Sequence, residues 1–341
     1  MKTKGRIGFA VVGLGNIALG SVLPAFAHSK RAKLIALISR DKKKAARLAQ
    51  KFSAKASFSF DEYSACLRNP AIAAVYIATP PGEHLALTIQ AARAGKHILC
   101  EKPLAATVEQ SAELVKACRD AGVLLMTAYR KHFEPGCLYL KQLIRSGALG
   151  RIDVIHTSFS ELHIPGASLD WLLDSRLAGG GPLMDLGVYC VNTSRWLVEE
   201  DPAEVNAASW SHDKTRFRQV EEGVSFRMRF PSGLVVQASS TYSAVLSSFL
   251  YIQGAKGWAS YSPAFTFDEE RRFSAKIGKR RFQRTFKVVD EFALEIDALA
   301  AAIQGKRAVE PDGLQGHRDM VILNAIYESA GKQESVAIRY E

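Results

Sequence analysis

Hydrophobic and polar positions alternate in two different ways along this chain. From residue 6 to about residue 127, short apolar runs take turns with stretches of helical spacing, which predicts a parallel sheet covered by helices on both faces. The expected strands are Arg6 to Val12, Lys33 to Ser39, Ala74 to Ile77, His97 to Cys100 and Leu124 to Thr127. The expected helices are Asn16 to His28, Asp41 to Phe52, Glu83 to Ala94 and Thr107 to Ala121, the last with Thr107 and Gln110 at capping-box spacing.

After residue 150, strand follows strand. The expected strands are Ile152 to Ser160, Val205 to Trp210, Val224 to Phe230, Leu234 to Ser240 and Phe249 to Gly254. Stretches such as VSFRMRF alternate apolar and polar residues, which predicts an antiparallel sheet with one covered face. Helices are expected at Pro182 to Leu197, Glu291 to Gln304 and Leu314 to Ala330. We therefore predict an α/β doubly wound domain over residues 1–127 and an α+β domain over residues 128–341.

Composition supports two globular domains and argues against two classes of partner. A chain of 341 residues is longer than one typical domain with a single hydrophobic core. The net charge of +11 is spread over short basic runs without interleaved aromatic residues, so we expect no nucleic acid partner. No apolar run approaches the ~20 residues that span a bilayer, so we expect no membrane partner. The five cysteines have neither paired nor metal-ligand spacing, which favours a reducing cytoplasm and no metal site.

The stretch VVGLGNIA follows the first expected strand directly. It places Gly13 and Gly15 in a tight turn, with Ala18 at the third position of a G-x-G-x-x-A pattern and Asn16 and Ile17 at the start of the next helix. Glycines allow the backbone to approach a pyrophosphate, and the helix start offers N–H groups to it. We predict that Gly13, Gly15, Asn16 and Ile17 bind a dinucleotide.

The end of the second strand indicates which dinucleotide. Ser39 and Arg40 stand where an acidic residue would grip the ribose of NAD, and Lys44 follows. Hydroxyl and guanidinium groups can bind a 2′-phosphate that a carboxylate would repel, so the sequence favours NADP, with NAD possible. Asp41 is expected to cap the following helix, although a tighter loop would bring it to the ribose.

Two further turns follow expected strands at the same edge of the sheet. The first, TPPGEH, contains Thr79, Pro80, Pro81 and His84, which we expect to flank the dinucleotide. The second, LCEKPLA, ends a buried strand with Glu101 and Lys102. Because a proline follows, Lys102 is kept out of helical geometry and is held extended at the strand end.

Several motifs occur in a characteristic order: the glycine loop, ATPPGEH, GKHILCEKP, AYRKHFEP, GGGPLMDLGVYCVN and GHRDMVILNAIYESA. Together they resemble the Gfo/Idh/MocA oxidoreductase family, and its glucose–fructose oxidoreductase branch, over essentially the whole chain. The resemblance implies an N-terminal Rossmann domain and a C-terminal substrate-binding domain with a large open, mostly antiparallel sheet. It also implies a homodimer or homotetramer formed through that sheet.

The resemblance implies three catalytic residues: Lys102 of the EKP motif, and Asp185 and Tyr189 of MDLGVY. Asp185 and Tyr189 are four residues apart in an expected helix, so both can face one cleft. A phenol has an ordinary pKa of about 10, and a neighbouring Lys102 ammonium would help Tyr189 to accept the substrate proton. Asp185 would position a sugar through its hydroxyls. The glycines at 179–181 are expected to let this helix approach the nicotinamide pocket.

Three further positions are candidates for the site. Glu101 is a candidate for the nicotinamide ribose, and Arg130 is a candidate either for the cofactor or for an ion pair at the domain interface. Members of the branch often carry Trp-Arg before the glycine triplet, whereas here Leu172 follows the tryptophan. Arg176 could replace that arginine, or the role is absent.

The resemblance implies hydride transfer between NADP and a sugar, and we expect oxidation of an aldose at C1 to its lactone. The alternatives are an NADPH-dependent keto- or anhydro-sugar reductase, a trans-dihydrodiol dehydrogenase, a glycosidase that uses nicotinamide transiently, and a regulator that senses NADP without turnover. The presence of all three candidate catalytic residues favours an enzyme. Without the long leader and arm of the periplasmic type, an exchangeable cofactor in a cytoplasmic enzyme is expected.

Overall fold

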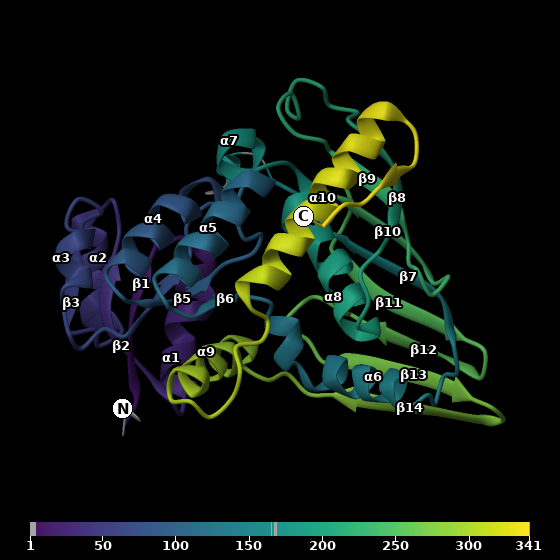
Figure 1. Ribbon diagram of the computed structural model, residues 1–341, viewed down its shortest axis with the longest axis horizontal. Helices are drawn as coiled ribbons and strands as arrows, with labels where there is room; N and C mark the ends of the chain where they lie inside the picture. The colour runs from purple at the N-terminus through teal and green to yellow at the C-terminus, as the bar shows by residue number, and fades with distance from the viewer. Residues whose placement is uncertain (1–4, 165, 167–168, 341) are drawn as a thin grey trace. The chain divides into compact units, whose positions relative to one another are not determined.

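The computed structural model describes residues 5–164, 166 and 169–340 (Figure 1). By their internal packing, the residues form two compact units: Met1–Arg130 with Asp290–His317, and Lys131–Val289 with Arg318–Glu341. The sequence patterns did not indicate that residues 290–317 pack with the first unit. The domain boundaries at 1–127 and 128–341 stay a prediction, since compact packing does not test independent folding.

The first unit contains a six-stranded sheet in the order β3-β2-β1-β4-β5-β6. All its pairs are parallel, so the predicted doubly wound sheet is confirmed. Its strands are β1 (Ile7–Val12), β2 (Ala32–Ile38), β3 (Ala56–Phe58), β4 (Ala74–Ile77), β5 (His97–Cys100) and β6 (Leu125–Thr127). The sequence missed β3, which is only three residues long and half-buried.

Helices connect and cover these strands. They are a π-helical segment (Ala18–Val22) leading into α1 (Leu23–His28), then α2 (Lys42–Lys51), α3 (Tyr63–Leu67), α4 (Pro81–Arg93), α5 (Val108–Asp120) and α9 (Glu291–Ile303). In Figure 1, α4 and α5 pack against each other, and α9 lies beside α1. Every residue of β1 and β4 is buried, as expected for parallel strands covered on both faces.

The predicted helix starts have the expected caps. The carboxylate of Asp41 accepts a hydrogen bond from Lys44 N at 2.9 Å, which confirms it as the N-cap of α2. The hydroxyl of Thr107 accepts one from Gln110 N at 3.2 Å at the start of α5. Asp290, the first residue of the segment that returns to the first unit, is the N-cap of α9, and its side chain accepts a hydrogen bond from Ala293 N.

The second unit contains a nine-stranded sheet in the order β14-β13-β12-β11-β7-β10-β9-β8-β15. Only β10 and β7 pair in parallel; the other pairs are antiparallel, as predicted. The strands are β7 (Ile152–Ser160), β8 (Glu204–Trp210), β9 (Gly223–Arg229), β10 (Val235–Thr241), β11 (Ser247–Gly254), β12 (Gly257–Ser262), β13 (Arg271–Ile277), β14 (Arg280–Phe286) and β15 (Val336–Ala337). The last four were not predicted, because β12 to β14 mix small, polar and basic residues without a long apolar run.

Helices cover one face of this sheet. They are α6 (Pro135–Arg145), a π-helical segment (Leu183–Gly187) continuous with α8 (Val188–Val198), and most of α10 (Gly313–Lys332). Short turns of helix occur at Arg130–Phe133, Asp170–Leu173 and α7 (Ser175–Ala178). Burial alternates along β9 and β10, so the inner side chains pack under the helices and the outer ones lie on an open face.

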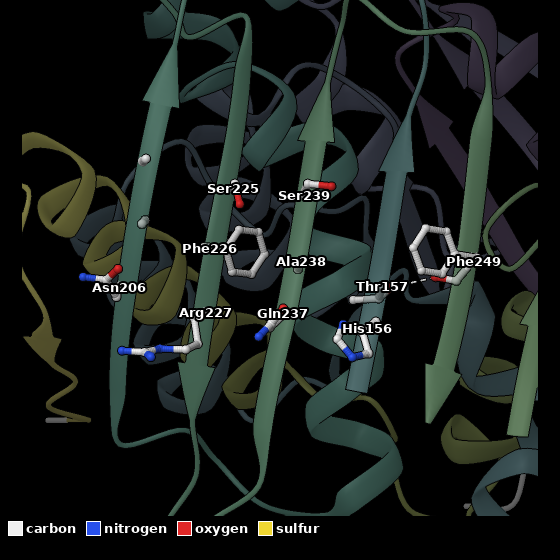
Figure 2. A pocket seen from close by; sticks show the side chains of 12 residues that line it. His156, Thr157, Asn206, Ser225, Phe226, Arg227, Gln237, Ala238, Ser239 and Phe249 are labelled. Carbon is white, nitrogen blue, oxygen red and sulfur yellow. Dashed lines mark hydrogen bonds between the residues drawn. The ribbon is translucent and has the colours of Figure 1, made fainter. Parts of the chain in front are cut away.

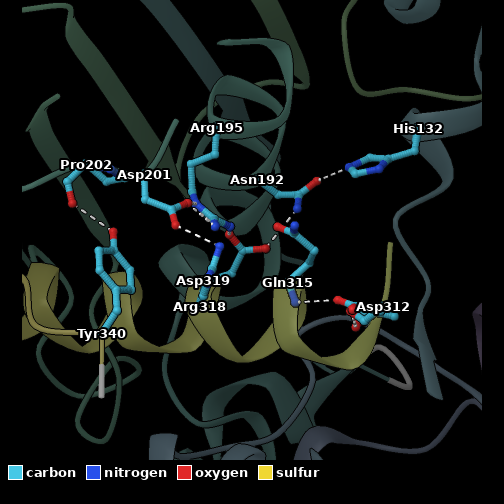
Figure 3. A network of polar contacts seen from close by, with 11 residues as sticks. His132, Asn192, Arg195, Asp201, Pro202, Asp312, Gln315, Arg318, Asp319 and Tyr340 are labelled. Carbon is cyan, nitrogen blue, oxygen red and sulfur yellow. Dashed lines mark hydrogen bonds and ion pairs between the residues drawn. The ribbon is translucent and has the colours of Figure 1, made fainter. Parts of the chain in front are cut away.

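A buried polar network fixes α8 against α10 within the second unit (Figure 3). Arg195 on α8 forms ion pairs with Asp201 and with the fully buried Asp319 on α10. Asn192, one turn earlier, donates to the second oxygen of Asp319 at 2.8 Å and lies 2.9 Å from the His132 ring. Because breaking a buried charge pair leaves an uncompensated charge, this network holds the helix that carries Tyr189 in place.

Within the described part of the chain, no helix is long and apolar enough to cross a membrane. The same residues contain no cluster of three or more histidine, cysteine or acidic side chains arranged to hold a metal ion. All five cysteines are buried and unpaired as disulfides.

Candidate active site

The glycine loop joins β1 to the first helical segment, which occupies residues 16–28. Gly13 has a φ of +89°, and a Cβ there would lie 2.5 Å from the carbonyl oxygen of Ala78. Only glycine fits that position. At Gly15, by contrast, a Cβ would lie in open space, so the packing of the unit does not require a glycine. The exposed Gly15 and Asn16 thus mark a place where the backbone is left accessible at a helix start.

The candidate cofactor residues at the end of β2 lie on the same edge of the sheet. Ser39 is buried, and its hydroxyl accepts a hydrogen bond from Asp41 N at 3.2 Å. The exposed Arg40 forms an ion pair with Glu83 and lies over the Phe60 ring, 5.2 Å from its centre. Asp41 Oδ1 caps α2, and the guanidinium of Arg40 is an exposed positive charge beside it in this turn.

The TPPGEH turn is held by its histidine. Pro80 and Pro81 begin α4, and His84 in its first turn is completely buried. The ring lies between two backbone carbonyl oxygens, with Nε2 2.8 Å from Thr79 O and Nδ1 3.2 Å from Leu104 O. In the neutral ring one of these nitrogens donates, and the ring packs between this turn and the one after β5. Burial lowers the pKa of His84, which keeps the ring neutral. His84 therefore shapes the two turns from inside the unit.

The EKP turn follows β5 in the first unit. Lys102 is half-buried, and its peptide bond to Pro103 is cis. Glu101 is buried: its Oε1 accepts a hydrogen bond from Tyr76 Oη at 2.8 Å, and its Oε2 accepts one from Lys102 N at 3.2 Å. Arg130 forms a buried ion pair with Glu291 of α9 at 2.6 Å. Glu101 and Arg130 thus have partners inside the first unit, and their cofactor contacts stay predictions.

The second unit carries the other two candidate catalytic residues on consecutive helical turns. Asp185 lies in the π-helical segment, and Tyr189 lies in the first turn of α8. Tyr242, which follows β10, donates a hydrogen bond to Asp185 Oδ2 at 3.2 Å. Burial and the Asp185 carboxylate raise the pKa of Tyr242 well above its ordinary value, so it remains a donor. Sequence analysis missed this tyrosine, because no motif in its neighbourhood marks it as functional.

Tyr189 packs in a cluster with two aromatic side chains that sequence analysis also missed. Its ring centre is 5.5 Å from that of Phe159 at the end of β7 and 5.7 Å from that of Phe265. Phe159 and Phe265 are themselves in ring contact, at 5.5 Å. The phenol is thereby packed in an apolar, aromatic surround, with only 8% of its surface exposed.

The glycine triplet before this helix lies against side chains of the same unit, and its expected role beside the nicotinamide stays a prediction. Gly179 has a φ of +83° and ends α7, whereas a Cβ on Gly180 would lie 2.0 Å from Tyr327 Oη. At Gly181 a Cβ would lie 2.3 Å from the carbonyl oxygen of Glu221. The carboxylate of Glu221 accepts hydrogen bonds from Gly181 N at 3.0 Å and from Leu183 N at 2.9 Å. The second and third glycines therefore leave room for the half-buried Glu221, itself hydrogen-bonded by Tyr327, to accept bonds from the start of the helix.

Two protein-family models match the chain. The model described as the oxidoreductase family with an NAD-binding Rossmann fold matches residues 7–129, and the model of the GFO/IDH/MocA C-terminal domain matches residues 137–260. The chain belongs to the GFO/IDH/MocA oxidoreductase family. It is an NAD(P)-dependent oxidoreductase with a Rossmann domain, as the sequence predicted.

Several known proteins are similar to this chain along nearly its whole length. The D-xylose 1-dehydrogenase (NADP(+)) of Haloarcula marismortui is 29% identical over 339 residues, which are 98% of this chain and 94% of that protein. The crystal structure of an aldose-aldose oxidoreductase from Caulobacter crescentus, complexed with glycerol, has a TM-score of 0.93 at 32% identity and covers 98% of this chain and 100% of that one. The structure of levoglucosan dehydrogenase with NADH and levoglucosan has a TM-score of 0.86 at 25% identity, covering 98% and 99%.

The first unit of this family member fits a dinucleotide on its own geometry. The backbone at Gly15 has open space beside it, and Thr79 Oγ1 on the same sheet edge is buried without a hydrogen-bond partner among the described residues. An unpartnered buried hydroxyl costs free energy unless a ligand completes its bonding. The glycine loop, the Ser39–Arg40 turn and Thr79 would together hold the pyrophosphate and adenosine ribose.

The Trp-Arg pair common in this branch of the family is altered here. Leu172 is buried in a short 3-10 turn. Arg176 is exposed and its guanidinium bonds Asp174, the N-cap of its own helix, at 3.0 and 3.2 Å. The structure thus gives Arg176 a local partner, and whether it replaces the missing arginine stays an open prediction.

Proposed function

We propose that this oxidoreductase uses NADP to oxidise an aldose at C1 to its lactone. The observation that carries the proposal is the pair Asp185 and Tyr189 on consecutive helical turns, with Tyr189 walled by aromatic rings. The buried rings of Phe159 and Phe265 hold the Tyr189 ring in place, and an oriented carboxylate suits the hydroxyls of a sugar. The names of the relatives, a xylose dehydrogenase and an aldose-aldose oxidoreductase, support a sugar substrate.

The proposed mechanism divides the work among three side chains. The bound nicotinamide supplies the hydride acceptor. Tyr189, as the phenolate that the Lys102 ammonium stabilises, takes the proton of the C1 hydroxyl and becomes the phenol, while the ammonium hydrogen-bonds the reacting oxygen. Asp185, held by Tyr242, accepts hydrogen bonds from neighbouring sugar hydroxyls and sets the ring orientation. We infer that Lys102, Asp185 and Tyr189 act on one substrate molecule.

The preference for NADP over NAD rests on the turn after β2. Arg40 is exposed and is braced by Glu83 and Phe60, and the neighbouring Asp41 caps α2 through its Oδ1. A guanidinium can bind a 2′-phosphate with two hydrogen bonds. Arg40→Ala should raise the KM for NADP⁺ by about tenfold and leave the KM for NAD⁺ unchanged. The exposed Arg47 of α2 provides the control, Arg47→Ala.

The deciding experiment is nicotinamide absorbance when the protein meets NADP⁺ or NAD⁺ with a panel of aldoses. Continuous reduction that prefers NADP⁺ supports the proposal. If one sugar alone gives no reduced cofactor, NADPH with keto sugars tests the reverse direction, and pairs of aldoses analysed for products test a reaction without net cofactor change. Binding of NADP without product in any of these mixtures would contradict the enzyme proposal and favour a sensor.

We also propose that the protein forms a homo-oligomer through the open face of its nine-stranded sheet. Neighbouring strands place small side chains side by side there, with Ser158 opposite Ser239 and Ser239 opposite Ser225. Figure 2 shows that His156, Gln237, Arg227 and Asn206 form a polar row beside them, and the hollow they line contains none of the candidate catalytic residues. Small and polar side chains on this face allow the sheet of a second copy to approach closely.

Solution mass tests this part of the proposal. Ser239→Arg places a bulky charge in the centre of the row of serines and should convert the oligomer to monomer in light scattering. Ser64→Arg on the exposed face of α3 is the control. A monomeric native protein, or an oligomer unaffected by Ser239→Arg, would contradict the assignment. A cytoplasmic location remains a prediction of the sequence.

A further inference from the structure

Three buried side chains form a hydrogen-bonded chain directly behind the EKP turn. They come from different elements of the first unit: Tyr76 from β4, Glu101 from the end of β5 and Glu295 from α9. Tyr76 and Glu295 are completely buried, and Glu101 is 9% exposed. Tyr76 Oη lies 2.8 Å from Glu101 Oε1 and 2.9 Å from Glu295 Oε1. Neither dinucleotide binding nor the proposed proton transfer explains why two acids share one phenol.

Proton accounting restricts the charge of this cluster. A tyrosine hydroxyl carries one proton and can donate it to one acceptor. If both carboxyl groups were ionised, one carboxylate oxygen would face the lone pairs of Tyr76 Oη in a buried site, which is costly. One carboxyl group therefore carries a proton and donates it to Tyr76, and Tyr76 donates its own proton to the other. The same logic governs carboxyl pairs that share a proton in other proteins.

The surroundings of the two acids indicate which one is protonated. Glu101 has a second donor in Lys102 N, and the charge of Lys102 favours its ionised form, whereas Arg130 favours ionisation of both acids. Glu295 Oε2 is buried without a hydrogen-bond partner among the described residues, and the nearby Glu291 carboxylate opposes a second negative charge. An unpartnered oxygen is tolerated on a neutral acid far better than on a carboxylate.

The charges around the two acids agree with this geometry. Burial, followed by the charge of Glu101, raises the pKa of Glu295 well above its ordinary value. Burial also raises the pKa of Glu101, but Lys102 opposes that shift, whereas the Tyr76 hydroxyl and Arg130 act in the same direction on both acids. The remaining neighbour on β5, Cys100, stays a neutral thiol because burial raises its pKa. The asymmetry between the two acids comes from their partners, since both are buried.

We infer that Glu295 is a neutral carboxylic acid which, through Tyr76, holds Glu101 as the carboxylate beside Lys102, so that Glu295 and Tyr76 are positioning residues for the lysine. The part that concerns Lys102 rests on the function proposed above. In this arrangement the hydrogen-bond direction runs from Glu295 to Tyr76 to Glu101. The fixed negative charge of Glu101 supports the Lys102 ammonium that the proposed oxidation needs.

A matched pair of amide variants separates the two acids. Glu295→Gln keeps a donor toward Tyr76 and should retain most of the turnover, with the acid limb of the kcat/KM profile in place. Glu101→Gln removes the charge beside Lys102 and should lower turnover by at least tenfold. The reverse result, with Glu101→Gln mild and Glu295→Gln severe, would overturn the assignment.

Two further variants test the link through the phenol. Tyr76→Phe removes the donor to Glu101, so Glu101 protonates more easily and the acid limb of kcat/KM should move to higher pH. Glu295→Leu breaks the chain at its other end and should cause a shift in the same direction, which Glu295→Gln rescues. Melting curves of all variants identify those that fail to fold, and an acid limb unmoved in folded Tyr76→Phe would contradict the positioning role.

Infrared spectroscopy of the free protein tests the protonation state without any turnover. A protonated-carboxyl band should be present at neutral pH, should lose intensity in Glu295→Gln and should keep it in Glu101→Gln. Because burial also raises the pKa of Glu221, the band is assigned by difference between variants. No loss in Glu295→Gln would overturn the inference even in an active enzyme. A loss in a protein that oxidises no sugar would leave the cluster standing and reject the proposed function.

Discussion

The two units place their candidate catalytic groups by different physical means. In the first unit, Lys102 follows a buried parallel strand, and sheet topology alone brings it to the edge where Gly13 and Thr79 lie. In the second unit, Asp185 and Tyr189 lie on a helix whose start is capped by Glu221 and whose acid is oriented by Tyr242. Parallel-sheet topology brings the EKP turn to this edge before any side-chain contact acts, whereas the position of the helix itself depends on side-chain contacts that single substitutions can remove.

The largest expected effect concerns the group placed by topology. Lys102→Met removes the ammonium but keeps the length of the side chain, so turnover should fall by on the order of 10³-fold. The sheet and the glycine loop are unchanged, so the affinity for NADP⁺, measured by calorimetry, should change little. Glu109→Gln, on the exposed part of α5, is the control for a lost surface charge. Equal loss of turnover and of cofactor binding would reject the catalytic assignment.

Tyr189→Phe is the corresponding test in the second unit. The aromatic contacts with Phe159 and Phe265 remain, while the proton acceptor is lost, so turnover should fall by about 10²-fold or more with a smaller change in KM. Steady-state kinetics over a range of pH provide the measurement. Unchanged turnover across pH would instead leave Lys102 as the base.

The sequence predicts features with a local signal and misses those that depend on contacts between distant segments. The strands β4 and β5 and the cap of α2 were predicted correctly, because apolar runs and capping residues are local signals. Tyr242, Phe159 and Glu295 were missed, because each reaches its partner from a distant segment and has no local motif. The sheet strands β12 to β14 were missed for lack of apolar periodicity. Local patterns predict elements, while long-range pairing decides which side chains meet.

Glycine substitutions compare the two units through the free energy of unfolding. Gly13→Ala in the first unit and Gly181→Ala in the second each force a Cβ against backbone, at 2.5 and 2.3 Å, and should lower the free energy of unfolding by about 1–3 kcal/mol. Gly15→Ala meets no atom within 4 Å and should keep the stability while weakening NADP⁺ binding. Denaturant unfolding and calorimetry measure the two properties. A destabilised Gly15→Ala, or one that binds NADP⁺ normally, would contradict the role given to this loop.

The smallest expected effect concerns the tyrosine that orients Asp185. Tyr242→Phe removes one hydrogen bond of 3.2 Å, so the KM for the sugar should rise by about fivefold while kcat changes little. Since burial and Asp185 raise the pKa of Tyr242, the hydroxyl stays protonated, and the effect should be the same throughout the neutral and mildly alkaline range. Tyr139→Phe on α6 is the control, because this ring packs against Phe273 and Phe286. A fall in kcat as large as that of Tyr189→Phe would mean that Tyr242 takes part in the proton transfer, and the second unit would then place its chemistry on the sheet as well as on the helix.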